Sequence, residues 1–127
     1  MKKIEIENLI LTSKCIQGTT IIAWEGTVRE RDPYKKLIPA LDSLLEEEDD
    51  NGDLKIIFNK LEYINSTSIL AIIDFLKKTD QRTITTIVEY DPAVSWQKTI
   101  FPVLGKFSKI LKKLTVVETS GQSNAIS

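Results

Sequence analysis

The sequence contains no histidine and a single cysteine, Cys15. Histidine is the commonest general base and a frequent metal ligand, so its absence excludes Ser-His-Asp hydrolases, phosphohistidine relays and Cys/His metal sites. A lone cysteine cannot form a disulfide within the chain, and we interpret Cys15 as an ordinary strand residue. These absences favour a protein that acts by binding and not by catalysing a reaction.

The sequence also lacks an excess of either charge and lacks long apolar runs. Seventeen basic and eighteen acidic residues leave a net charge of -1, which disfavours a nucleic-acid partner. The longest apolar stretches, such as residues 69–73, are far shorter than the ~20 residues of a membrane-spanning helix. The N-terminus lacks the apolar region of a signal peptide, so we expect a cytoplasmic protein.

The length and composition suit one hydrophobic core. A chain of 127 residues with 42% hydrophobic residues can bury enough apolar surface without disulfides or metals. We expect residues 1–119 to form a single domain. Residues 120–127 have the small, polar composition of a flexible C-terminal tail.

Five segments have the patterns of β-strands. Residues 4–12 alternate between polar and apolar side chains, and residues 19–28 are rich in β-branched residues, which predicts antiparallel strands at the start of the chain. Residues 54–58 form a short apolar run between turn residues, as in a strand at the centre of a sheet. Residues 83–90 and 114–118 are the remaining predicted strands.

Three segments have helical patterns. Asp32 and Pro33 signal the start of a first helix, whose apolar side chains recur at helical spacing. These side chains are Leu37, Ile38, Leu41, Leu44 and Leu45. The stretch from Asn65 to Lys78 has cap residues at its head and lysines in its last turn. Residues 99–113 form a strongly amphipathic basic pattern with Pro102 in its first turn. The residues predicted for its apolar side are Ile100, Val103, Leu104, Phe107, Ile110 and Leu111.

The order of these elements predicts an α/β fold. Strands that alternate with helices indicate a mixed sheet with a mainly parallel core, reached by right-handed crossovers. About three main helices would pack on this sheet. The first strands would add to it in antiparallel orientation.

An acidic run follows the first predicted helix. Residues 46–50 are all glutamate or aspartate, and Asn51 and Gly52 follow them. A metal site is conceivable there, but the run lacks the alternating ligands and the closing glutamate of a calcium loop. We therefore predict a solvated loop without a metal.

One segment resembles a known family. Residues 54–70, Leu-Lys-Ile-Ile-Phe-Asn-Lys-Leu-Glu-Tyr-Ile-Asn-Ser-Thr-Ser-Ile-Leu, resemble the signature segment of STAS domains. STAS is the fold of bacterial anti-sigma-factor antagonists, in which a strand leads to an Asp-Ser-Ser-Gly-like turn that opens a helix. Residues 91–114, with Trp96-Gln-Lys before an amphipathic stretch, are similar to a STAS-like branch of uncharacterised bacterial regulators. The resemblance implies a STAS-like fold and a regulatory role.

The resemblance also implies a site and partners. In the antagonists, the second hydroxyl residue of the turn is phosphorylated by a partner kinase that also serves as the anti-sigma factor. Asn65 stands where the family has aspartate, Ser66 at the first hydroxyl, Thr67 at the phosphorylated hydroxyl and Ser68 where glycine is usual. Thr67, and after it Ser66, is the implied phosphorylation site, with Asn65 to Ser68 as the partner-binding surface. The implied partners are a serine/threonine kinase of the anti-sigma type and a phosphatase, without a cofactor.

The residues leave other interpretations open. The hydroxyl run could serve only as a helix cap, and the domain could bind a small ligand or act as a scaffold without phosphorylation. An enzyme without histidine would have to use groups such as Asp74, Glu62 and Ser66 in a deep pocket. The basic face of residues 99–113 could lie on an anionic membrane, but its apolar side is more simply explained as cover for the sheet.

Overall fold

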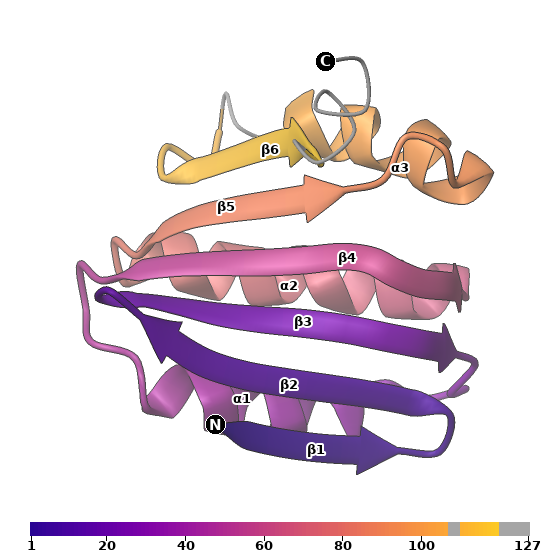
Figure 1. The fold of residues 1–127 in the computed structure, drawn as a ribbon, viewed down its shortest axis with the longest axis horizontal. Helices are drawn as coiled ribbons and strands as arrows, with labels where there is room; N and C mark the ends of the chain where they lie inside the picture. The colour runs from indigo at the N-terminus through magenta and orange to yellow at the C-terminus, as the bar shows by residue number, and fades with distance from the viewer. Residues whose placement is uncertain (107–109, 120–127) are drawn as a thin grey trace.

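The chain forms a six-stranded mixed sheet, seen face-on in Figure 1, in a computed structural model that describes residues 1–106 and 110–119. The strands lie in the sheet in chain order. They are β1 (Lys2–Ile6), β2 (Leu9–Ile16), β3 (Thr19–Val28), β4 (Asp53–Ile64), β5 (Thr85–Tyr90) and β6 (Leu114–Glu118). The pairs β1–β2 and β2–β3 are antiparallel, whereas β3 to β6 are parallel. The predicted mixed sheet with a parallel core is thereby confirmed.

The helices of the described chain connect the parallel strands. They are α1 (Leu37–Glu46), α2 (Ser66–Gln81) and α3 (Ser95–Gly105). In Figure 1, α1 and α2 lie behind the sheet, and α3 lies beside β5 and β6. Because each crossover joins neighbouring parallel strands with the usual right hand, the helices cover one face of the sheet.

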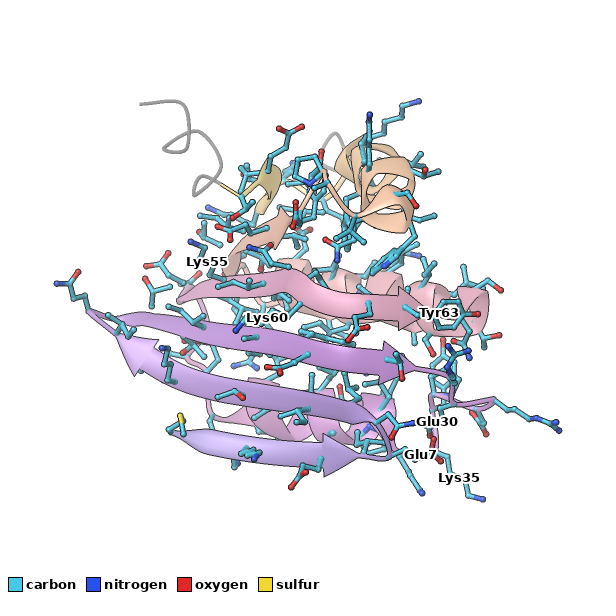
Figure 2. All side chains as sticks on the ribbon, turned by 45° about the vertical axis from the view of Figure 1, so that its right-hand side comes forward. Glu7, Glu30, Lys35, Lys55, Lys60 and Tyr63 are labelled. Atoms are coloured by element: carbon cyan, nitrogen blue, oxygen red, sulfur yellow. The ribbon has the colours of Figure 1, made fainter. Side chains whose placement is uncertain are left out.

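The core lies between this face and the helices. Ile22, Ile56 and Val88 are paired across β3, β4 and β5, and all three are buried. Farther along, the ring of Phe58 lies 4.9 Å from that of Phe101 of α3, between ring centroids. The alternate residues of the same strands point to the other face, where Lys55 and Glu89 form an ion pair of 3.2 Å. Figure 2 shows Lys55 on this open face.

Two strand predictions differ from the structure. Residues 4–12 are not one strand, because Glu7 adopts a positive φ of 53° and turns the chain between β1 and β2. The predicted central strand 54–58 continues to Ile64, so residues 59–64, which lie beyond the predicted strand, also belong to β4. Cys15 is an exposed residue of β2, as predicted for a strand residue.

The helix starts also differ. α1 begins at Leu37, after a turn over residues 33–36, and not at the Asp32-Pro33 signal. Pro39 consequently lies in its first turn, where the missing N–H costs nothing. α3 begins at Ser95 and includes Pro102 in its interior, so the predicted first-turn position of this proline is wrong.

The buried face of α3 is rotated from the predicted one. Gln97, Phe101 and Leu104 are buried, whereas Val103, which we placed on the apolar side, is 54% exposed. The described helix ends at Gly105, and Ile110 lies in a turn. Residues 107–109 of the predicted helix and residues 120–127 of the predicted tail lie outside the described residues.

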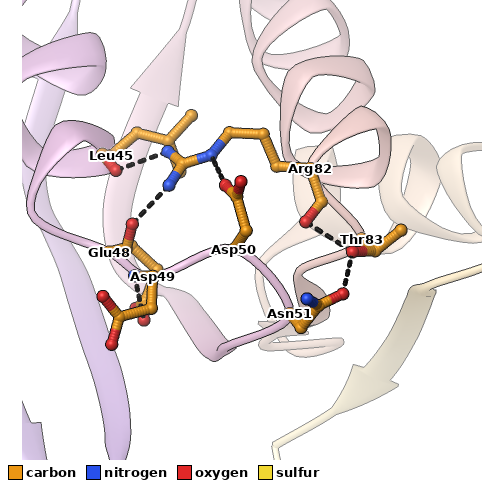
Figure 3. A network of polar contacts seen from close by, with 7 residues as sticks. All are labelled: Leu45, Glu48, Asp49, Asp50, Asn51, Arg82 and Thr83. Carbon is orange, nitrogen blue, oxygen red and sulfur yellow. Dashed lines mark hydrogen bonds and ion pairs between the residues drawn. The ribbon is translucent and has the colours of Figure 1, made fainter.

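The acidic loop is fastened to the end of α2, as Figure 3 shows. Arg82 donates hydrogen bonds to the carbonyl oxygens of Leu45, at 2.7 Å, and of Glu48, and its Nε donates to Asp50 Oδ1 at 2.5 Å. The guanidinium therefore lies at the carbonyl end of α1, where a positive charge is favourable. Within residues 1–106 and 110–119, no three acidic or cysteine side chains are grouped to hold a metal ion.

Candidate functional site

Asn65 joins the end of β4 to the start of α2. Its backbone N–H donates to Val28 O of β3 at 3.0 Å, and its Nδ2 donates to Glu30 O at 2.8 Å. Its Oδ1 accepts a hydrogen bond from the backbone N–H of Ser68 at 3.0 Å, which makes Asn65 the N-cap of the helix. The neutral amide thus uses both its donor and its acceptor. An aspartate here could cap the helix but could not donate to Glu30 O.

The hydroxyl residues after Asn65 have two different environments. Ser66 and Thr67 are exposed in the first turn of α2, at the carboxyl end of the central strand β4. Ser68 is fully buried and therefore contributes nothing to an exterior surface. Its φ is not positive, so its position does not require a glycine. Of the four residues of the predicted partner-binding surface, Asn65, Ser66 and Thr67 are at least partly exposed, whereas Ser68 is not.

The cap supplies a first test of this local geometry. Replacing Asn65 by alanine should lower the free energy of unfolding by about 1–2 kcal/mol, because it removes the cap and the bond to Glu30 O. Asn65→Asp, which keeps the cap acceptor, should cost less. Urea denaturation of the three proteins checks this expectation, and equal stabilities for wild type and Asn65→Ala would contradict it.

The C-terminal part of β4 is held in place by Gln97 of α3. Its Nε2 donates to Phe58 O at 2.7 Å and to Leu61 O at 2.9 Å, and its Oε1 accepts from the backbone N–H of Asp91 at 2.8 Å. β5 pairs with β4 only as far as Ile57, so these carbonyls have no neighbouring strand on that side. The buried amide of Gln97 takes the place of that strand. It thereby fixes the segment that leads to Asn65.

The exposed face of α2 continues beyond the hydroxyls with residues that the sequence interpretation missed. Leu70 follows Thr67 by three positions on the same face and is 62% exposed. Tyr34, from the loop between β3 and α1, is 51% exposed and donates a hydrogen bond to Asp74. We call Ser66, Thr67, Leu70, Asp74 and Tyr34 the α2 surface. The sequence contains a signal for an exposed apolar residue on this helix, because the apolar residues of α2 are too many for one buried stripe.

A charged loop follows the carboxyl end of β3, next to the carboxyl end of β4. An open hollow of about 370 Å³ is lined by side chains from the β1–β2 turn and the β3–α1 loop. These residues are Glu7, Arg29, Glu30, Arg31, Asp32, Lys35 and Lys36. Figure 2 shows Glu7, Glu30 and Lys35 together there. The guanidinium carbon of Arg29 lies 4.3 Å from the ring centroid of Tyr63, near the end of β4. Burial raises the pKa of Glu30. The hydrogen bond that Tyr34 donates to Asp74 raises the pKa of the Tyr34 hydroxyl.

The groups considered for an enzyme do not converge. Asp74 is bonded to Tyr34, Glu62 is exposed on β4, and Ser66 is exposed on α2. None of these three side chains lines the charged hollow or a second hollow of about 590 Å³ beside the acidic loop. The site is an exposed, hydroxyl-bearing surface. Such a surface suits contact with another protein better than enclosure of a substrate.

The fold is similar to that of a known regulator. The crystal structure of an anti-sigma factor antagonist from Mycobacterium paratuberculosis matches it with a TM-score of 0.65 over 97% of both chains, at 12% sequence identity. This similarity confirms the STAS-like fold expected from residues 54–70. No protein-family model and no curated protein matches the sequence.

None of the helices in the described ranges combines the length and the apolar composition needed to cross a bilayer.

Proposed function

We propose that the chain is a non-catalytic, cytoplasmic regulatory domain that binds a protein partner through the α2 surface. Phosphorylation of Thr67, or of Ser66, switches this binding off. A serine/threonine kinase of the anti-sigma type adds the phosphate, and a phosphatase removes it, as in partner-switching systems. The observation that carries the proposal is the exposure of both hydroxyls in the first turn of α2, beside a separate residue, Asn65, that already caps the helix.

One residue caps the helix and two others expose their hydroxyls, which supports regulation over capping alone. The cap acceptor comes from Asn65, and no capping bond from Ser66 or Thr67 is needed to start the helix. Both hydroxyls are therefore accessible to a kinase without unfolding the helix. The similarity to an anti-sigma factor antagonist, which is a similarity of fold, is consistent with this role.

The position at a helix N-terminus explains how the domain would tolerate the modification. A phosphoryl group adds about -1.5 to -2 charges and three acceptor oxygens. The first-turn N–H groups and the helix dipole favour negative charge there, and no acidic side chain lies in the first turn. The phosphorylated domain should stay folded.

The same charge would oppose binding. A partner that covers Leu70 and Tyr34 must also cover Thr67, because they share the α2 surface. A phosphate buried there without a matching cation would lose its hydration, which costs several kcal/mol. Binding and phosphorylation should therefore exclude each other.

Affinity capture from the cells of origin tests the proposal. Wild-type protein should retain a specific partner, and Thr67→Glu should lose it, because the glutamate brings negative charge to the contact. Thr99→Glu is the matched control, since Thr99 is exposed on α3 and the substitution is the same. Thr67→Val should keep the partner, because it removes the hydroxyl without adding charge. Retention of the partner by Thr67→Glu would contradict the switch.

A further inference from the structure

The sheet ends on one side at β1. This strand pairs with β2, and within residues 1–106 and 110–119 no strand pairs with its other edge. The outer edge therefore presents unpaired backbone N–H and C=O groups, which can accept another strand. Natural sheets commonly block such an edge with charges of one sign. Here the two charged residues that share one face of β1, Lys3 and Glu5, have opposite signs.

The side chains of β1 are divided between the two faces of the sheet. Ile4 and Ile6 lie opposite the buried residues Leu11 and Leu9 and pack against the core on the helix side. Lys3 and Glu5 point to the open face and are exposed. Neither forms an ion pair within the described residues.

Charge selects one register for pairing β1 with a second copy of itself. A two-fold axis perpendicular to the sheet makes the two strands antiparallel and keeps both helix layers on the same side. Centring the axis on Lys3 would oppose two lysines, and centring it on Glu5 would oppose two glutamates. Centring it on Ile4 places Lys3 opposite Glu5 of the second copy, twice, and Ile4 opposite Ile4. Only the third register pairs opposite charges.

Lys2 fits the same register. It would lie opposite Ile6 of the second copy on the helix side, where a free charge would be unfavourable. However, Lys2 forms an ion pair with Glu47 just beyond α1, so its charge is not free.

The outer edge of β6, at the other side of the sheet, offers no comparable match, because centring an axis on Val116 would oppose Leu114 to Glu118.

We propose that the chain forms a symmetric homodimer by antiparallel pairing of the β1 edges, centred on Ile4. The two sheets become one continuous sheet, and the partly exposed Ile4 side chains of the two copies come together on the helix side. The α2 surface lies on the other side of α1 and remains free in both copies. The dimer would thus present two partner-binding surfaces.

A charge-reversal series measured by sedimentation velocity tests this dimer. Wild type should be dimeric in a concentration series, and Lys3→Glu and Glu5→Lys should each raise the dissociation constant at least about tenfold, because each opposes two like-charged pairs. The double variant Lys3→Glu/Glu5→Lys should restore the dimer. Lys14→Glu, a reversal of an exposed lysine on β2 beyond the end of β1, is the control and should stay dimeric. Circular dichroism should show all variants folded.

A cross-link tests the register independently. In a Cys15→Ser background, Ile4→Cys should form an intermolecular disulfide on mild oxidation, because directly opposed residues of antiparallel strands lie within disulfide reach. Ser13→Cys should not form such a disulfide, because Ser13 lies on β2, one strand away from the proposed contact. A wild type that remains monomeric, or a double variant that fails to recover the dimer, would overturn the proposal.

Discussion

Replacing Gln97 by methionine should lower the free energy of unfolding by about 3–5 kcal/mol. The substitution keeps the volume but removes the amide that bonds Phe58 O, Leu61 O and the Asp91 N–H. Gln97 is fully buried, so water cannot replace those bonds without opening the core. Each buried backbone group left without a partner costs about 1–3 kcal/mol. Urea denaturation followed by tryptophan fluorescence measures the loss.

The matched control is Gln81→Met. Gln81 is exposed at the end of α2, and the same substitution there should change stability by less than about 0.5 kcal/mol. Gln97→Met should also weaken capture of the partner, since β4 leads directly to Asn65 and the α2 surface. Similar stabilities of the two variants would show that Gln97 does not hold β4.

Arg82→Met should cost about 2–3 kcal/mol, the second-largest loss that we expect. Methionine preserves much of the apolar stem but removes the bonds to Leu45 O and Glu48 O and the ion pair with Asp50. The carbonyl end of α1 would then face the acidic run 46–50 without a compensating charge. Most of this loss should come from the bonds to carbonyls, because Asp50 is largely exposed and its pairing contributes little.

Two further variants separate these contributions. Asp50→Asn should lower stability by less than about 1 kcal/mol, because it removes only the exposed ion pair. Arg31→Met removes an exposed arginine elsewhere and should have little effect. If Arg82→Met were no more harmful than Asp50→Asn, the bonds to the α1 carbonyls would not contribute as we expect.

Local signals predicted the parts of the fold that depend on neighbouring residues. The cap at Asn65 and the lysines near the end of α2 are read from a few adjacent positions, and the structure confirms that helix. The exposure of Ser66 and Thr67 follows from their place in its first turn. The burial of Ser68 depends on how α2 packs on the sheet, and adjacent residues do not reveal it.

The missed features depend on contacts between distant segments. β4 continues past residue 58 because Gln97 supplies partners for its carbonyls, and its pairing with β3 shifts register between Ala23 and Glu25. That shift interrupts the apolar alternation by which a strand is recognised. The face of α3 was misassigned for a related reason, since a buried polar residue, Gln97, lies on its core side while the apolar Val103 is exposed.

Phosphorylation of the α2 surface can be measured directly by mass spectrometry of residues 61–77 in protein purified from its own cells. This segment contains both candidate hydroxyls between Lys60 and Lys77, which makes it readable as one tryptic peptide. We expect phosphate on Thr67 or Ser66 in the fraction of protein that has released its partner, and none in the bound fraction. An unmodified segment in both fractions would contradict phosphorylation as the switch.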